Sequence, residues 1–376
     1  MDPKTVITEL IKFKPKDKNA IEIFKHKLCK KYNLNVIYNS ELLSFYQTLV
    51  KNQTIKPNDS LKKLLISKNA RSLSGVSVVT LSSKPYPCPG NCLYCPTQKS
   101  VPKSYLDNEP AILRAIRHKY QPEPQVKERI KVLNLNGHPT DKLEIIIIGG
   151  TFSFFSKNYQ TNFIKKIFDT CNEKKSTTLE QAQKLNEKAK NRIVGLTIET
   201  RPDFINNKEI QHLRKLGVTR VEIGVQSIYN DILKQNRRGH PVKTTIEATK
   251  LLKDAGFKVC YHMMPNLYGS NTKKDLQMFK QLFSDQNFQP DMLKIYPCMV
   301  MKEADLYEIY KQNLYKPYNY KTLAKLLKNI LVILPTYVRV QRLIRDIPAQ
   351  SVVGGVRISN LREIIERELR EENKKV

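Results

Sequence analysis

Cys88, Cys92 and Cys95 lie within eight residues, with three residues between the first two and two between the last two. Three thiolates on one short loop can hold three irons of a four-iron cluster, which leaves the fourth iron open to a small molecule. A zinc site, the alternative, needs a fourth ligand such as His118 or His138. Such a tight group among seven cysteines indicates metal or redox chemistry rather than a disulfide framework.

Further residues suited to ligand binding end short apolar runs. Gly149 and Gly150 follow one run, and glycines let a backbone approach a ligand closely. Glu199 ends the next run, where a carboxylate can bind a ribose hydroxyl or an ammonium group, with a surface salt bridge as the alternative. Gln226 ends the run after that.

These runs predict the strands of a parallel sheet, because they alternate with stretches of helical spacing such as Thr245 to Ala255. We expect an α/β fold with a partial (β/α)6 barrel, whose chemistry lies at the carboxyl ends of the strands. The six runs are Val76 to Leu81, Leu143 to Ile148, Ile193 to Ile198, Val221 to Val225, Val259 to Met263 and Leu293 to Tyr296.

Residues 1–75 have a different texture, with apolar residues at helical spacing and 15 basic against 6 acidic residues. They predict a small basic N-terminal helical domain, whose charge suits a nucleic-acid partner. The barrel is expected over residues 76–345, followed by a C-terminal helical extension over 346–376.

The charge of the chain favours a polyanionic partner. Its 65 basic residues exceed its 35 acidic ones, giving a net charge of +30, which points to RNA unless lysine is simply abundant throughout. The 40% hydrophobic content excludes a disordered chain. No apolar run approaches the roughly 18 residues of a membrane helix, and no signal peptide is evident. A cytoplasmic protein with no membrane partner is therefore expected.

The cysteine spacing, on a loop after the first strand, resembles the radical S-adenosylmethionine superfamily. Longer stretches resemble one family within it, the catalytic subunit of Elongator and its bacterial and archaeal counterparts, which modify the wobble uridine of tRNA. The resemblance runs from about Arg71 to Glu363. The stretches that carry it include Pro102-Lys103-Ser104-Tyr105, Arg114-Ala115-Ile116-Arg117, Gly149-Gly150-Thr151-Phe152, Glu199-Thr200-Arg201-Pro202-Asp203, Asn236-Arg237-Arg238-Gly239-His240 and Arg345-Asp346-Ile347-Pro348.

The resemblance implies a [4Fe-4S] cluster on the three cysteines and S-adenosylmethionine beside it. A 5′-deoxyadenosyl radical would take a hydrogen from the methyl group of acetyl-CoA, and the resulting carbon radical would add to C5 of uridine 34 and leave a carboxymethyl group. Lys142 is implied to contact acetyl-CoA, with a solvated lysine as the alternative. The implied cofactor-binding residues are Tyr94, Gly149, Gly150, Thr151, Glu199 and Gln226, with Thr151 standing where many members have glutamate.

The residues expected to bind the anticodon loop of tRNA combine cations with aromatic rings. Paired arginines beside a glycine suit phosphate, with a solvated basic turn as the alternative, and aromatic rings stack on unpaired bases. The set comprises Lys103, Tyr105, Arg114, Arg117, Arg237, Arg238, His240 and Arg345.

The sequence departs from full-length family members, which carry an acetyltransferase-like unit after the radical domain. None is evident before Val376, so we expect a short form. Such a short form would work with an acetyltransferase or Elongator-like partner, or it would bind acetyl-CoA in the radical domain alone. A third alternative is that it modifies another RNA position. A homodimer and an unidentified electron donor are compatible with the sequence. Cys298 lies near an expected zinc ligand of the family but lacks partner cysteines. The alternative from another class is a non-catalytic, tRNA-binding iron–sulfur protein.

Overall fold

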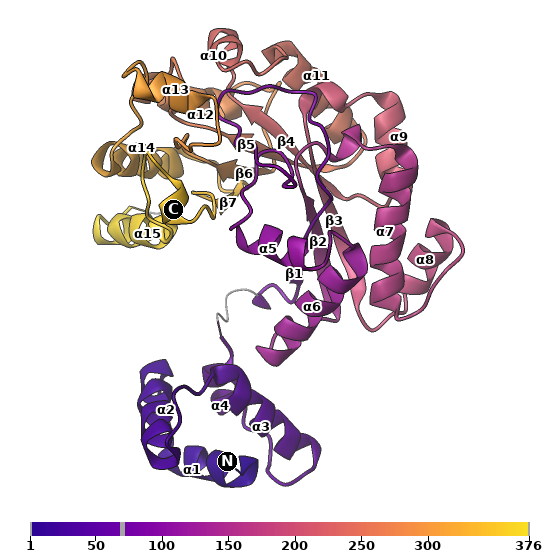
Figure 1. The fold of residues 1–376 in the computed structure, drawn as a ribbon, viewed down its shortest axis with the longest axis vertical. Coiled ribbons are helices and arrows are strands. Elements are labelled where there is room, and N and C mark those ends of the chain that lie inside the picture. Colours follow the sequence, from indigo (N-terminus) through magenta and orange to yellow (C-terminus); the bar gives the residue numbers. More distant parts are fainter. Residues whose placement is uncertain (1, 68–71, 375–376) are drawn as a thin grey trace.

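A parallel sheet of seven strands, ordered β1 to β7 as in the chain, forms the centre of the molecule (Figure 1). The structure, a computed structural model, describes residues 2–67 and 72–374, so Arg71 at the start of the family-like region lies outside it. The strands are β1 (Ser77–Ser82), β2 (Lys142–Ile148), β3 (Arg192–Thr200), β4 (Arg220–Gln226), β5 (Lys258–Met263), β6 (Met292–Ile295) and β7 (Arg339–Arg342).

The predicted α/β partial barrel is confirmed, with one strand more than the six expected. The additional strand, β7, pairs in parallel with β6. It has four residues, none of them fully buried, so it lacks the apolar run by which the other strands were recognised. β1 and β7 are the two edges of the sheet, and the barrel therefore stays open between them.

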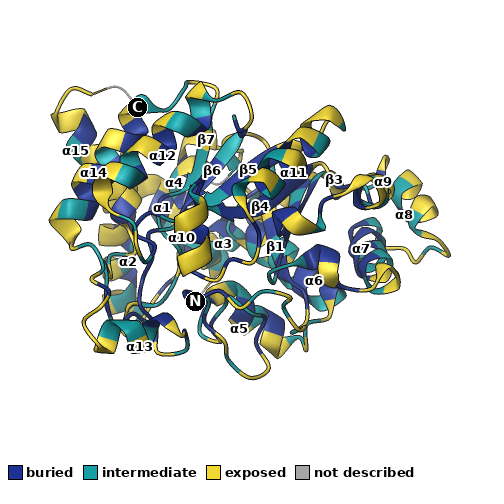
Figure 2. Cartoon of the chain, turned by 90° about the horizontal axis from the view of Figure 1, so that it is seen from above, coloured by how far each residue is buried: buried dark blue, intermediate teal, exposed yellow. Residues whose placement is uncertain are grey.

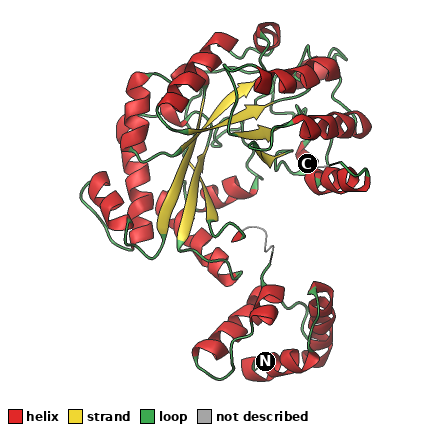
Figure 3. Cartoon of the chain, turned by 180° about the vertical axis from the view of Figure 1, so that it is seen from behind, coloured by secondary structure: helices red, strands yellow, loops and turns green. Residues whose placement is uncertain are grey.

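Helices cover the outer face of the curled sheet (Figure 3). Their outward sides are exposed, whereas the strands are mostly buried (Figure 2). These helices are α6 (Pro122–Leu135), α7 (Lys157–Asn172), α8 (Leu179–Asn186), α9 (Asn207–Lys215), α11 (Val242–Asp254), α12 (Thr272–Ser284), α14 (Tyr320–Ile333) and α15 (Leu361–Glu371). Helix α5 (Pro110–Arg117) instead packs against Ile146 and Ile148 of β2, and α10 (Asn230–Gln235) and α13 (Leu306–Lys311) pack against the segment that follows β1.

The two faces of the sheet differ in chemistry because successive side chains of a strand point to opposite sides. In β4, Val221, Ile223 and Val225 join the hydrophobic core under the helices. Glu222 and Gly224, between them, line the interior of the barrel. The apolar face therefore holds the fold together, and the opposite face is left for polar groups.

The first four helices form a separate bundle below the barrel (Figure 1). They are α1 (Pro3–Phe13), α2 (Lys18–Tyr32), α3 (Asn39–Lys51) and α4 (Asp59–Leu65). The bundle has its own hydrophobic core, centred on residues such as Ile7, Leu28 and Leu42. It approaches the barrel where Leu43 and Ile66 lie against Gly137, after α6.

The C-terminal helix α15 packs into the same core as the barrel helices, through Leu361, Ile365 and Leu369. In the part of the chain that the structure describes, no helix combines the length and apolar character needed to cross a membrane.

Candidate active site

The three cysteines lie on the segment between β1 and α5, which crosses the mouth of the barrel at the carboxyl ends of the strands (Figure 1). Backbone hydrogen bonds attach this segment to the turn after α10 and to the start of α13. Leu93 N–H donates to Asn236 O at 3.2 Å, and Leu306 N–H donates to Leu93 O at 2.8 Å. Cys92, Leu93 and Tyr94 are buried in an apolar cluster with side chains from both regions. The cysteine loop is therefore held rigidly over the sheet.

The three loop sulfurs are not gathered as tightly as the ligands of one zinc ion. Four ligands around one zinc at 2.3 Å would lie about 3.8 Å apart. Among the described residues, only Glu222, Cys260 and His262 form a group of three potential ligand atoms all within 4.8 Å of one another, so at least one pair of loop sulfurs lies farther apart than that. His118 and His138, the proposed extra ligands, lie beside Glu128 and Ser72 instead.

Two arginines lie beneath the cysteine loop. The guanidinium group of Arg238 is buried, with Nη1 3.6 Å from Cys92 Sγ and Nη2 donating to Gly224 O. Arg201 is paired bidentately with Asp203 at 2.8 and 2.9 Å, and its Nη1 is buried without a partner. Because a Cβ at Gly90 would collide with Arg201, that glycine lets the loop lie close to the cation. Negative sulfur ligands would be stabilised there.

Gly149, Gly150 and Thr151 follow the carboxyl end of β2, and Gln226 ends β4 on the other side of β3, so all lie at the same mouth of the barrel. Gly150, Thr151 and Gln226 line the cavity described below. The Gln226 Oε1 atom is buried without a partner. Gly149 has a φ of 127°, a conformation that side chains rarely adopt. These features leave backbone and amide groups available to a ligand beside the cysteines.

Gly149→Ala is expected to lower the free energy of unfolding by about 1–3 kcal/mol and to weaken S-adenosylmethionine binding. The added Cβ would overlap Ser83 Oγ, and Ser83 is fixed by its N–H bond to Ile148 O at 2.9 Å. Gly75→Ala is the matched control, since its φ of 74° is also positive but the space around it is open. Urea unfolding and equilibrium dialysis test this, and equal behaviour of the two variants would contradict it.

Buried charges continue from the mouth down the inner face of the sheet. Glu199 accepts a hydrogen bond from Tyr105 Oη at 2.7 Å and lies 3.9 Å from Lys294 Nζ. Arg345 stacks over the Tyr105 ring at 4.6 Å and pairs with Glu109 at 2.9 Å. Burial, and then the Glu199 charge, raises the pKa of Tyr105 well above its usual value, so its hydroxyl stays a donor.

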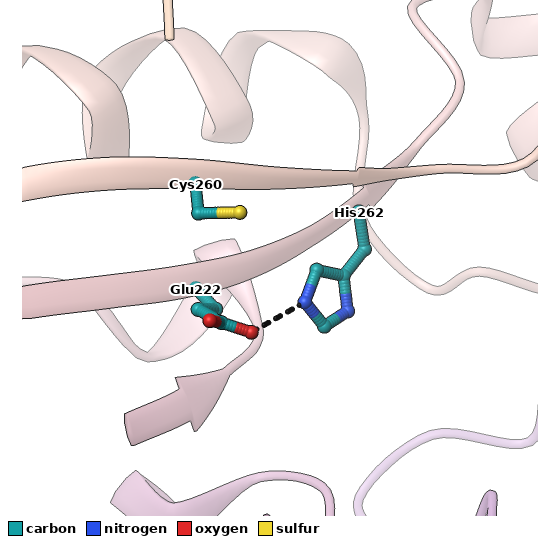
Figure 4. A group of neighbouring side chains, drawn as sticks. All are labelled: Glu222, Cys260 and His262. Carbon is teal, nitrogen blue, oxygen red and sulfur yellow. Dashed lines mark hydrogen bonds and ion pairs between the residues drawn. The ribbon is translucent and has the colours of Figure 1, made fainter. Parts of the chain in front are cut away.

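Glu222 is the centre of a second buried group (Figure 4). It is fully buried, accepts from His262 Nε2 at 2.8 Å, and is paired with Lys294 and, at 3.4 Å, with Arg220. Burial alone would raise the pKa of Glu222, but Lys294, His262 and Arg220 together hold it well below its usual value. Because Lys294 occupies the same oxygen as His262, the Glu222, Cys260 and His262 group is an ion-pair network rather than a metal site.

One continuous cavity of about 1810 Å³ joins these groups. Its lining includes the three cysteines at the mouth and reaches Glu144 and Arg220 near the amino ends of the strands. Ten of the 17 arginines in the chain line it, but only three of the 48 lysines. Arginine is therefore enriched in the cavity, although lysine is far more common in the whole chain. The guanidinium group of arginine can donate two parallel hydrogen bonds to a phosphate or a carboxylate.

The structure brings most of the predicted site residues together. Those lining the cavity are Cys88, Cys92, Tyr94, Cys95, Lys103, Tyr105, Arg114, Gly150, Thr151, Glu199, Gln226, Arg238 and Arg345. Arg238 and Arg345, which were predicted to bind tRNA, lie inside the site and bond protein groups. Arg238 does so because its helix-ending turn folds back under the cysteine loop.

Other predicted residues lie apart from the mouth. Lys142 is exposed and begins β2, so it lies at the opposite end of the strand from the cysteines. Arg114 donates to Thr80 O at 2.6 Å on β1. Arg117 and Arg237 are on the surface, paired with Glu128 and Asp305.

The sequence interpretation missed Arg220, Glu222, His262 and Lys294 as site residues. The signal was present, since buried parallel strands normally read as continuous apolar runs. In β4 and β5, charged or polar residues alternate with apolar ones instead. That alternation indicates a barrel interior lined with ionic groups.

His240, also buried at the mouth, gives the fold a dependence on pH. Burial, and then the charge of Arg238, lowers the pKa of His240 to about 4 from its ordinary 6.5. Between these values the unfolded chain binds more protons, so stability is complete above about pH 6.5 and is lost as the pH falls toward 4. The expected loss is about 2–3 kcal/mol. The free energy of unfolding is measured in urea near pH 7 and near pH 4.5. Between these two pH values it should fall less for His240→Asn than for the natural chain, and an equal fall would contradict this.

Two family models match the chain, the Radical SAM superfamily over residues 86–282 and the Radical SAM C-terminal domain over residues 290–371. A "tRNA uridine(34) acetyltransferase" of Methanocaldococcus infernus is 44% identical over 96% of this chain and 68% of its own length. Human "Elongator complex protein 3" is 40% identical over 80% of this chain and 57% of its own length. The chain thus spans roughly two thirds or less of these relatives.

A solved structure agrees with this likeness. The archaeal Methanocaldococcus infernus Elp3 with an N-terminal deletion superposes with a TM-score of 0.71 at 43% identity, covering 80% of this chain and 64% of that one.

Proposed function

The chain belongs to the radical SAM superfamily and, within it, to the Elongator catalytic-subunit family, and on that basis we propose that it modifies C5 of uridine 34 in tRNA. The relatives named above as tRNA uridine(34) acetyltransferases support this substrate. The observation that carries the proposal is the triad of cysteines at the mouth of an arginine-lined cavity.

We assign the [4Fe-4S] cluster to Cys88, Cys92 and Cys95. Bound there with S-adenosylmethionine, it supplies the one-electron chemistry that abstracts a hydrogen atom from carbon. The chain contributes Arg238, whose buried guanidinium group stabilises the negative charge of Cys92. A structural cluster in a non-catalytic RNA-binding protein would need neither the Glu199 carboxylate nor the unpartnered Gln226 oxygen that line the same cavity.

The S-adenosylmethionine site is assigned to the mouth next to the cysteines. The backbone at Gly149 and Gly150 allows the close approach of an amino acid group. Glu199, oriented by Tyr105 and Lys294, offers a carboxylate to a ribose hydroxyl or an ammonium group. Gln226 supplies an amide whose oxygen has no other partner. Each of these groups is held by the sheet, which fixes the reacting atom relative to the cluster.

The tRNA contact is assigned to Lys103, which lines the cavity at the mouth, and to Arg117 and Arg237, which are exposed on the surface outside it. A uridine of the anticodon loop is nearly unpaired, so its extrusion into the cavity costs little. Inside, Lys294 has three N–H donors and two carboxylate partners, Glu222 and Glu199, so one donor can bind a uracil or thioester carbonyl oxygen. The basic helices α1 to α4 are proposed to hold the body of the tRNA.

Acetyl-CoA is proposed as the acyl donor, giving a carboxymethyl-type group on uridine 34. The test is mass spectrometry of tRNA nucleosides after anaerobic incubation with reductant, S-adenosylmethionine and acetyl-CoA labelled in the methyl carbon. Labelled carboxymethyluridine at position 34 is expected. The label at another nucleoside would favour a different RNA position, and tRNA binding without modified nucleoside or S-adenosylmethionine cleavage would favour the non-catalytic alternative.

A further inference from the structure

Two exposed aromatic rings lie beside the cysteine loop, and the chemistry above uses neither of them. Tyr86 precedes Cys88 by two residues, and Phe154 ends the short helix η2 (Phe152–Phe154), three residues after Thr151. Tyr86 is 41% exposed and Phe154 is 36% exposed. Their ring centroids are 5.7 Å apart, and the ring planes meet at 63°. Among the described residues, no other two exposed aromatic rings are in contact.

The two rings belong to the mouth of the barrel, because the segments that carry them follow neighbouring strands. Tyr86 follows β1 and Phe154 follows β2. Phe204, whose ring centroid lies 5.5 Å from that of Phe154, follows β3. Cys88 and Thr151 line the cavity, and two residues of extended chain span at most about 7 Å. The neighbours of a nucleotide that enters the cavity are therefore within reach of these rings.

Buried rings hold the exposed Tyr86 ring in place. Tyr86 stacks on Phe155, with the ring centroids 4.4 Å apart and an angle of 28° between the planes. Phe155 belongs to the hydrophobic core and stacks in turn on Tyr159 at 4.5 Å. Because Phe155 covers one side of the Tyr86 ring, its exposed area is available to a planar partner on the other side. A ring that is already fixed in this way loses little conformational freedom when a base stacks on it.

A lysine lies next to these rings. Lys84 is exposed, and its Nζ atom lies 5.0 Å from the centre of the Tyr159 ring. Within residues 2–67 and 72–374, Lys84 forms no ion pair with a carboxylate. Proteins that bind single-stranded nucleic acid combine aromatic rings, on which bases stack, with cations that contact the backbone phosphates. The net charge of +30 favours the same class of partner.

The aromatic residue that the sequence indicated for base stacking, Tyr105, is engaged by other protein groups. Arg345 lies over its ring at 4.6 Å, and its hydroxyl group donates to Glu199 at 2.7 Å. Tyr94, the aromatic residue within the cysteine loop, is buried. Stacking at the mouth is therefore better served by the exposed rings of Tyr86 and Phe154.

We propose that Tyr86 and Phe154 form a stacking site for the base next to the uridine that enters the cavity, with Lys84 contacting a phosphate of the same strand. Because the two rings meet at a steep angle, a base can stack on one of them and meet the other with its edge. Stacking accepts any base, so the site holds the strand whatever nucleotide flanks the uridine. The proposal rests on the RNA substrate proposed above and adds the place where the flanking nucleotide binds.

The test measures the Kd of the full chain for a fluorescently labelled anticodon stem-loop RNA, by fluorescence anisotropy at one fixed salt concentration. Tyr86→Leu keeps an apolar side chain but removes the ring, and a rise in Kd of about fivefold or more is expected. Tyr86→Phe keeps the ring and should bind like the natural chain. Tyr337→Leu is the matched control and should leave Kd unchanged. Tyr337 is 57% exposed and contacts the Phe283 ring, but it precedes β7, at the opposite ends of the strands.

Changes in the RNA identify the base that stacks. An abasic site on one side of uridine 34 should raise the Kd of the natural chain and remove the difference between it and Tyr86→Leu. Lys84→Gln should lower the slope of log Kd against log salt concentration by about one, whereas Tyr86→Leu should leave that slope unchanged. The iron content of each variant shows whether the cysteine loop is intact. Phe154→Leu, on a separate segment, repeats the test without a change in that loop.

An unchanged Kd for both Tyr86→Leu and Phe154→Leu would overturn the proposal. So would a rise in Kd that is equally large with RNA lacking either flanking base, since the rings would then not act by stacking. The modification reaction fails separately: RNA binding that depends on these rings and on a flanking base, without modified uridine, would contradict the reaction and support the stacking site.

Discussion

Cys92→Ala is expected to abolish both iron binding and S-adenosylmethionine cleavage, leaving 5′-deoxyadenosine at the background of a reaction without enzyme. Cys92 is the most buried of the three loop cysteines, 5% exposed, and the one that approaches Arg238. The two remaining thiolates cannot ligate three irons of the cluster. Among the described residues, no histidine or carboxylate forms a group of potential metal ligands with the loop sulfurs, so no other side chain can take the place of Cys92.

The control for this variant is Cys29→Ala, in the N-terminal bundle, where the thiol is half-buried on α2. Iron and zinc contents, the visible absorption of the reconstituted protein and chromatography of 5′-deoxyadenosine check the result. A Cys92→Ala protein that keeps its iron, or a natural chain that takes up zinc instead, would contradict the assignment of the loop.

Glu222→Gln is expected to lower the free energy of unfolding by about 3–5 kcal/mol, because it removes the negative charge shared by Lys294 and Arg220 and leaves the buried Lys294 with Glu199, 3.9 Å away, as its remaining carboxylate. Burial alone would lower the pKa of Lys294, but the Glu222 charge outweighs it and raises that pKa, so the lysine stays charged. Lys294→Met in the same chain should restore part of the lost stability, since no buried cation is then left against the amide.

Urea denaturation of the single and double variants measures this coupling. The control is Glu247→Gln, which breaks an exposed pair with Lys243 and should leave the stability unchanged. If Glu222→Gln and Glu247→Gln behaved alike, the Glu222 network would have no structural role and the ionic interior would need another explanation.

Much of this architecture was predictable because apolar periodicity is a local property. Six strands were found from runs such as Leu143 to Ile148, since each buries a full face against helices. β7 was missed because Arg339 and Arg342 give it no such run. The cysteine loop was predictable because its spacing alone carries the chemistry.

The interior of the barrel was predictable only in part, since it depends on which strands become neighbours. The contacts of Glu222 with Lys294 join residues 72 positions apart. In the sequence, Arg238 belongs to a run of basic residues that predicts an exposed or phosphate-binding turn. Arg238 becomes a buried neighbour of Cys92 only because the cysteine loop folds over this turn. The concentration of arginines in the cavity likewise appears only once α15, β7 and β1 line the same cavity.

The measurement that tests the account most directly is 5′-deoxyadenosine formation by the anaerobically reconstituted natural chain, given S-adenosylmethionine and a reductant, with and without tRNA. The account predicts 5′-deoxyadenosine that requires the cluster and increases when tRNA is added. No 5′-deoxyadenosine from a protein whose cluster is intact and is reduced, as shown by electron paramagnetic resonance, would contradict it.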